Sequence, residues 1–171
     1  PVDGSFTEPF YYVYDYAGIS VNNAKATDEY QLYGVLYNWD AANVSCPEGW
    51  HLPSDTEWEQ LAEFINIDND GAYNKEIVSE YEGWWNDIGN HLKSNSGWNQ
   101  NGTDNYGFTG IPCGFRAHSG VFGRKDSHVF WWSATEYYNS AWTRELQNTN
   151  SKFLRVRYDK YDGFSVRCVK D

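Results

Sequence analysis

The segment CPEGWHLPSDTEWEQL, from Cys46 to Leu61, constrains the fold most strongly because it contains a full signal for the start of a helix. Ser54 follows Pro53 and stands three residues before Glu57, the spacing of a capping box in which side chain and backbone exchange hydrogen bonds. Apolar residues then recur at helical spacing, at Trp58, Leu61, Ala62 and Ile65. The segment therefore predicts an amphipathic helix that begins after Ser54 and buries Trp58.

Aromatic residues must supply most of the core. The chain has 9 Trp, 14 Tyr and 9 Phe but no Met among its 171 residues. This length favours a single domain, residues 1–171. Rigid aromatic rings suit a loop-rich fold and also a binding surface, because Tyr and Trp give a large contact area at a low entropic cost.

The charge and hydropathy exclude two classes of partner. A net charge of −11 and the lack of a Lys/Arg cluster disfavour nucleic acid, which requires a concentrated basic surface. No apolar stretch reaches the roughly 18 residues that a membrane-spanning helix needs, so we expect no membrane insertion by this chain.

The order of patterns indicates an α+β domain. We expect an extended arm or strand over 1–32, a helical part over 33–65 with a first short helix from Tyr33 to Val44, and a long loop region over 66–107 rich in turn residues. Residues 108–171 contain short alternating segments typical of an antiparallel sheet and form a strand-rich part that displays the ligand surface.

Five motifs in order resemble the Fibrobacter succinogenes major paralogous domain, a module of secreted and surface proteins of Bacteroidetes and their phages. They are YGVLYNW, CPEGWHLPSDTEWEQL, GTDNYGFTGIP.GFR, FWWSATE and GFSVRCVKD, and they extend from about Tyr33 to the C-terminus. This family in turn resembles the C-type lectin fold and the formylglycine-generating enzymes. The resemblance implies two helices, a small twisted antiparallel sheet and long irregular loops.

The same resemblance bears on the cysteines. It implies a disulfide between Cys46, after the first helix, and Cys168, in the last strand; two free core thiols are the alternative. Cys113 stands where the family often has a small residue, and we interpret it as a buried filler. The cysteine pair that the enzymes carry before their final strand is missing here, which argues against that catalysis.

One segment has the beginning of a calcium loop. Asn66, Asp68 and Asp70 precede Gly71, but the position of the bidentate Glu is occupied by Ile77. Calcium is therefore the one cofactor considered, and a solvated turn after the helix is the other interpretation. The four histidines lack the spacing of a zinc pair.

The C-terminal half has the composition of a recognition surface. Tyr, Asn, Ser, Trp, Arg and His alternate there with framework-like residues. We expect the ligand to be bound by His118, Phe122, Arg124, Lys125, His128, Trp131, Tyr137, Tyr138, Asn139, Trp142, Asn148 and Arg155.

This composition also resembles proteins that retroelements diversify at adenines, which would make the surface hypervariable. An ordinary aromatic sheet with polar turns is the alternative.

The sequence thus favours a non-enzymatic adhesin or receptor-binding domain, on a bacterial cell surface or a phage virion, with a protein or carbohydrate ligand. The two rival hypotheses are an enzyme related to the formylglycine-generating enzymes and a purely structural surface module. Oligomeric state is not predicted.

Overall fold

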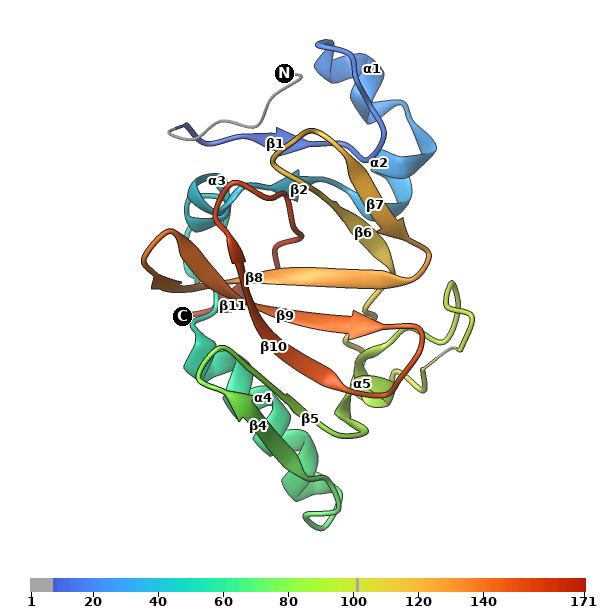
Figure 1. Ribbon diagram of the computed structural model, residues 1–171. Coiled ribbons are helices and arrows are strands. Elements are labelled where there is room, and N and C mark those ends of the chain that lie inside the picture. The colour runs from blue at the N-terminus through green and yellow to red at the C-terminus, as the bar shows by residue number, and fades with distance from the viewer. Residues whose placement is uncertain (1–7, 101) are drawn as a thin grey trace.

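A seven-stranded sheet forms the centre of the protein (Figure 1). The computed structural model describes residues 8–100 and 102–171. Neighbouring strands are antiparallel except for β6 and β8, which are parallel. In sheet order the strands are β4 (Lys75–Ser79), β5 (Glu82–Trp85), β10 (Phe153–Asp159), β9 (Ser140–Gln147), β8 (His128–Tyr137), β6 (Cys113–Arg116) and β7 (Phe122–Lys125).

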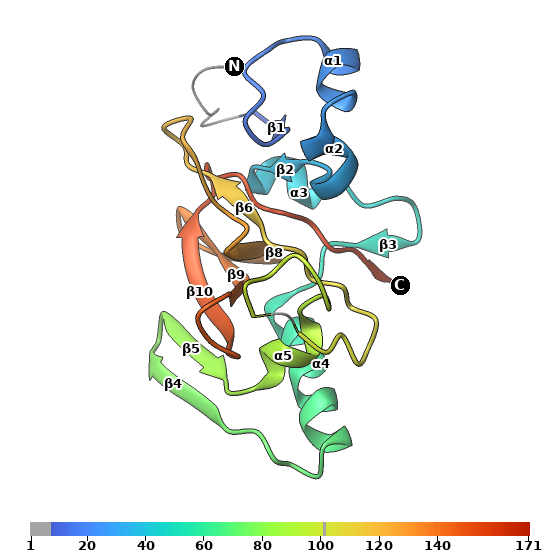
Figure 2. The same ribbon diagram turned by 90° about the vertical axis from the view of Figure 1, so that its right-hand side faces the viewer.

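The predicted amphipathic helix is confirmed as α4 (Asp55–Asp68), which lies with α5 (Ile88–Leu92) on one side of the sheet (Figure 2). Its capping box is complete: the Glu57 amide donates to Ser54 Oγ over 3.2 Å, and the Ser54 amide donates to Glu57 Oε2 over 2.8 Å. Trp58, Ala62 and Ile65 are buried against the sheet. Helix α4 therefore fixes which sheet face is internal.

Both faces of the sheet are apolar, and each packs into its own core. The α4 side buries Trp131, Val129, Leu146 and Phe153 together with Trp58. The opposite face buries Phe130, Trp132, Ala141 and Phe164. Because successive strand residues point to opposite faces, Trp131 and Trp132 belong to different cores although they are adjacent in sequence.

The N-terminal part differs from the prediction. The arm over 1–32 contains α1 (Val21–Lys25) and most of α2 (Asp28–Tyr33), whose first turns are capped by the side chains of Ser20 and Thr27. Residues 1–7 of the arm lie outside the described residues. The helix expected from Tyr33 to Val44 was wrong in its start, because β1 (Tyr11–Tyr12) pairs with β2 (Leu36–Tyr37) and α3 (Trp39–Asn43) begins only after the cap of Asn38.

The expected loop region over 66–107 was also partly wrong. It contains α5 and the β4–β5 hairpin, and β5 pairs with β10 to extend the main sheet. Besides the two expected helices, the structure thus contains the short helices α1, α2 and α5, and it has fewer long irregular loops than expected. The coarser prediction, helices combined with a largely antiparallel sheet, holds.

The predicted disulfide is present and links the segment after α3 to the C-terminal segment. Cys46 and Cys168 are joined with their Cα atoms 5.8 Å apart, next to the small sheet formed by β3 (Trp50–His51) and β11 (Val169–Lys170). Cys113 is buried, as predicted, and burial raises the pKa of its thiol to about 11. Within the described part of the chain, no helix has the length and apolar character to cross a membrane.

Candidate ligand-binding surface

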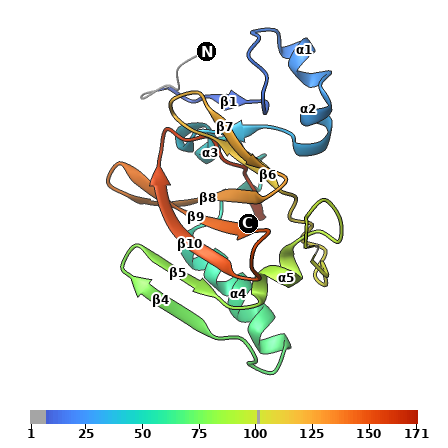
Figure 3. The ribbon, with the colours of Figure 1, turned by 45° about the vertical axis from the view of Figure 1, so that its right-hand side comes forward.

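Several of the predicted ligand residues meet at one edge of the sheet, the edge formed by the ends of its inner strands and not by an outer strand. There the turns of the β8–β9 and β4–β5 hairpins lie near each other (Figure 3). We call the residues at this edge the aromatic–arginine cluster; they are Tyr81, Tyr137, Tyr138, Trp142, Arg155 and Arg157. The tip of the cluster is Tyr138, which is 83% exposed.

Stacked rings and guanidinium groups build the cluster. The Arg155 guanidinium lies 3.1 Å from the centroid of the Trp142 ring, and the Arg157 guanidinium lies 3.8 Å from Tyr81 and 4.0 Å from Tyr137. The Tyr137 and Tyr138 rings meet edge to face with centroids 4.8 Å apart. Cation–π attraction favours this stacked arrangement, so the exposed rings rest on the two guanidinium groups of the strand.

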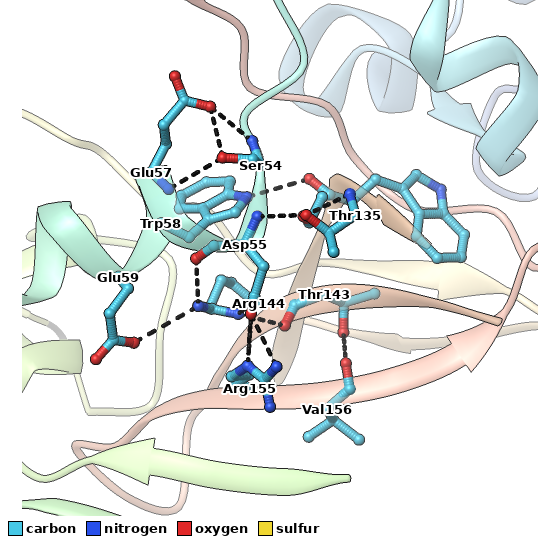
Figure 4. A network of polar contacts seen from close by, with 12 residues as sticks. Ser54, Asp55, Glu57, Trp58, Glu59, Thr135, Thr143, Arg144, Arg155 and Val156 are labelled. Carbon is cyan, nitrogen blue, oxygen red and sulfur yellow. Dashed lines mark hydrogen bonds and ion pairs between the residues drawn. The ribbon is translucent and has the colours of Figure 1, made fainter. Parts of the chain in front are cut away.

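An ion network under the cluster fixes it to α4 (Figure 4). Asp55 accepts hydrogen bonds from Arg144 Nη1 at 2.6 Å and from Arg155 Nε at 2.9 Å, and Arg144 Nη2 lies 3.7 Å from Glu59. Burial alone would raise the pKa of Asp55, but the hydrogen bond from Arg155 and the charge of Arg144 outweigh it and hold that pKa below its usual value. Arg144 is only 2% exposed, so the centre of this network is buried and supports the fold.

A second set of predicted residues lines a groove on the opposite sheet face. His118, Arg124 and His128 border a hollow of about 570 Å³ with Glu145 and Asp162 in its wall. The aromatic side chains lining it are Phe115, Phe130, Tyr158 and Phe164. The groove is thus polar at its rim and aromatic inside.

Internal contacts occupy the acids of the groove. Glu145 accepts hydrogen bonds from Gln147 at 2.7 Å and from the Tyr158 hydroxyl at 3.3 Å, and the Asp162 carboxylate accepts one from the His118 amide at 2.9 Å. Burial raises the pKa of Glu145, and burial together with the charge of Arg124 lowers the pKa of His128. We therefore interpret the groove first as a structural feature.

Other predicted ligand residues have internal partners. Trp131 is 4% exposed within the core, so its inclusion in a ligand surface was wrong. Phe122 packs on Tyr14, and Lys125 forms an ion pair with Glu29 at 3.1 Å.

Of the remaining candidates, Asn139 and Asn148 lie in turns and Trp142 lies in β9. Asn139 is exposed beside Tyr138, and the backbone of Asn148 donates a hydrogen bond to Ser127. Trp142, only 6% exposed, supports the cluster from below.

Sequence reasoning missed Tyr81 and Arg157, the two residues that complete the cluster. Arg157 belongs to the alternating segment FLRVRYD, where its side chain shares a face with Arg155. That alternation was a usable signal. Tyr81 gave none, because only the pairing of β5 with β10 brings its turn to this edge.

The calcium candidates are engaged in closing the end of α4. Asn66 Oδ1 accepts a hydrogen bond from the Tyr73 amide at 2.8 Å, and Asp68 accepts one from the Tyr106 hydroxyl at 2.7 Å. Asp70 is exposed and has a φ of +58°. Over residues 8–100 and 102–171, no group of three or more His, Cys, Asp or Glu side chains is placed to hold a metal ion.

The fold and the surface define a disulfide-linked domain that combines helices with a seven-stranded mixed sheet and two small two-stranded sheets. The chain belongs to the Fibrobacter succinogenes major domain family, which it matches over residues 2–170. The match includes the N-terminal residues that the sequence motifs had left outside the resemblance. Searches of curated proteins and of solved structures gave no significant match.

Proposed function

We propose that this chain is a non-enzymatic ligand-binding domain that contacts its partner through the aromatic–arginine cluster. The observation that carries the proposal is the exposure of Tyr138, Tyr137 and Tyr81, at 83%, 37% and 42%, on a support of stacked guanidinium groups. Tyr and Arg are the residues most enriched at binding hot spots. Aromatic groups held out into water in this way indicate a surface that a partner covers.

The scaffold is proposed to be C-type-lectin-like. Supporting features are the placement of α4 after the Cys46 segment and the Cys46–Cys168 link that the resemblance implied. The disulfide favours an oxidising compartment. We propose an extracellular location, on a bacterial cell surface or a phage virion, with a protein or carbohydrate ligand.

Diversification by a retroelement is a further part of the proposal. Tyr137, Tyr138 and Asn139 lie in a turn whose change would not disturb the core. Sister copies of the domain from one genome should differ at these positions, at adenines, and should share Asp55 and Trp58. Sister copies that are identical in this turn would contradict diversification.

The rival activity is oxidation of a peptide cysteine, as in the formylglycine-generating enzymes. The engagement of Cys46 with Cys168 and the raised pKa of Cys113 leave no activated thiol for it among the three cysteines. Incubation with a sulfatase-like cysteine peptide, followed by mass spectrometry, should show no formylglycine. Formation of that product would overturn the proposal.

The direct test is binding to a printed array of bacterial surface glycans and peptides. The Tyr137→Ala/Tyr138→Ala variant should lose its array signal while keeping the melting temperature of the parent protein within a few degrees. Val44→Ala/Ile67→Ala is the matched control, because both residues are 75% exposed and lie outside the cluster. Retention of the signal by the tyrosine variant would place the binding surface elsewhere.

A further inference from the structure

Arg157 is the member of the cluster whose surroundings do not satisfy it. Its guanidinium lies over the faces of Tyr81 and Tyr137 and 5.6 Å from the centroid of the Trp142 ring, so three aromatic rings surround it. Its Nε is buried and has no hydrogen-bond partner, and no carboxylate of the described residues forms an ion pair with it. The protein therefore holds a partly buried positive charge without an acceptor.

Such an arrangement is costly when the site is empty. A buried donor without a partner destabilises the folded state, and more so when the group is charged. Cation–π attraction to the two rings offsets part of this cost but accepts no hydrogen bond. An incoming acceptor would recover the rest, which makes the Arg157 guanidinium a preformed binding point for an anion.

We infer that Arg157 receives a carboxylate group presented by a partner protein. The inference rests on the proposed function, because it names the chemistry that the cluster recognises. The planes of these two rings stand at 67° to each other with centroids 6.1 Å apart, so the rings enclose the guanidinium on two adjacent sides. An acceptor can approach along the remaining edge, where a planar carboxylate can form two parallel hydrogen bonds. A divalent phosphate would bring more negative charge against the ring faces of a protein whose net charge is −11.

The shape of the region favours a protein as the carrier of this group. The β8–β9 hairpin projects from the sheet (Figure 3). Tyr138 lies in its turn, between the end of β8 and the start of β9, and is 83% exposed. A projecting Tyr beside an Arg suits insertion into a protein surface, where such residues act as anchors. An Asp or Glu side chain on the partner would accept the hydrogen bonds of Arg157, and an apolar pocket beside it would receive Tyr138.

Tyr81 is the cover of the site. Its ring lies over Arg157 but is 42% exposed, in the turn between β4 and β5. Rotation of an exposed side chain takes picoseconds to nanoseconds, so Tyr81 can move aside and open Arg157 Nε to the ligand. Arg155 provides the contrast, because its Nε already donates to Asp55 at 2.9 Å.

The experiment uses the Nε–H resonances of the ¹⁵N-labelled protein. The Arg157 signal is assigned by its loss in the Arg157→Lys variant, and the probe is N-acetylglutamate α-amide, which carries one carboxylate. We expect a saturable shift of the Arg157 signal with this probe, no shift with N-acetylglutamine amide, and an unmoved Arg155 signal. No shift, or equal shifts from both probes, would overturn the inference.

Two further probes test the chemistry and the source of the anion. Inorganic phosphate should shift the signal less than the glutamate probe; a larger effect would make this a general anion site and contradict the carboxylate assignment. Glucuronate should also bind more weakly than the glutamate probe. Tighter binding of glucuronate would contradict a protein partner and would indicate an acidic sugar as the ligand.

Failure of this inference can be told apart from failure of the proposed function. On the peptide array, Arg157→Gln should weaken binding about tenfold or more, and Arg157→Lys, which keeps the charge but not the fork, should bind at an intermediate level. If Arg157→Gln binds normally while Tyr137→Ala/Tyr138→Ala does not, the inference fails and the function stands. If the Arg157 resonance responds but no array partner exists, the carboxylate chemistry of Arg157 stands, whereas the proposed function and the protein partner fail.

Discussion

Arg155 and Arg157 lie on the same face of β10 but in opposite electrostatic situations. Arg155 donates to Asp55 and stacks on Trp142, next to the α4 terminus. Arg157 lies over the rings of Tyr81 and Tyr137, and its Nε has no acceptor among the described residues. The strand thus passes from a part of the sheet beside α4, where Arg155 is paired with a carboxylate, to an edge where Arg157 has no such pair among the described residues. We propose that a partner supplies the missing acceptor there.

The largest test of this comparison removes the shared acceptor. In Asp55→Asn, the buried Arg144 loses its closest anion, and we expect a loss of about 3–5 kcal/mol in the free energy of unfolding. Urea denaturation measures it. Asp70→Asn, at an exposed position with a φ of +58° that Asn tolerates, should change the value by less than about 0.5 kcal/mol. Equal effects of the two changes would contradict the structural role of Asp55.

The matched substitution at the paired arginine comes next. Arg155→Met removes the donors to Asp55 but leaves Arg144 in place, so a loss of about 1.5–3 kcal/mol is expected. Methionine keeps much of the length of the side chain over Trp142, so the change reports on charge more than on packing. A loss below about 0.5 kcal/mol would mean that Arg144 alone satisfies Asp55.

Acidic pH should remove the stability that ionised Asp55 contributes through its pairs with Arg144 and Arg155. The pKa of Asp55 is lowered in the folded protein, so its stabilisation is present above the pKa of the unfolded chain and is lost as pH falls through the lower folded value. The stability gap between the parent protein and Asp55→Asn should therefore narrow in that acidic range. Thermal melts of both proteins from neutral to acidic pH measure the gap, and a constant gap would contradict the assignment.

Glu145 extends the comparison to the opposite sheet face, where it is a buried charge with neutral donors. Its pKa is raised by burial, so the ionised form opposes folding and the penalty is complete above the folded pKa. Glu145→Gln should stabilise the protein on the order of 1 kcal/mol at neutral pH. The gain should shrink as pH falls through the raised pKa, and a loss of stability at neutral pH would show that the charge is needed in the groove.

Elements stabilised by contacts between residues close in sequence could be predicted, whereas elements stabilised by contacts between distant residues could not. The start of α4 was predictable because Ser54 and Glu57 signal to each other within one turn. The bridge from Cys46 to Cys168 was implied only through the family resemblance. The β4–β5 hairpin was missed because it is stabilised by pairing with β10, distant in sequence.

The candidate site shows the same division. Tyr137 and Tyr138 were predicted from composition, and the turn that exposes them is local. The burial of Trp131 could not be predicted, since alternation places Trp131 and Trp132 on opposite faces but gives no sign that both faces are covered. The pairing of Tyr81 with Arg157 required the three-dimensional position of the hairpin.

The smallest expected effect is the most informative about function. In Arg157→Met, the loss of cation–π attraction and the relief of an unpartnered charge oppose each other, so stability should change by less than about 1 kcal/mol. The loss in the free energy of unfolding should be compared with that of Arg155→Met under the same urea titration. Because the substitution and the strand face are identical, a difference between the two losses reports on the surroundings of each arginine. Destabilisation of Arg157→Met as large as that of Arg155→Met would mean that Arg157 serves the fold. A small change, with loss of array binding, would mean that the uncovered edge keeps Arg157 for a partner and not for stability.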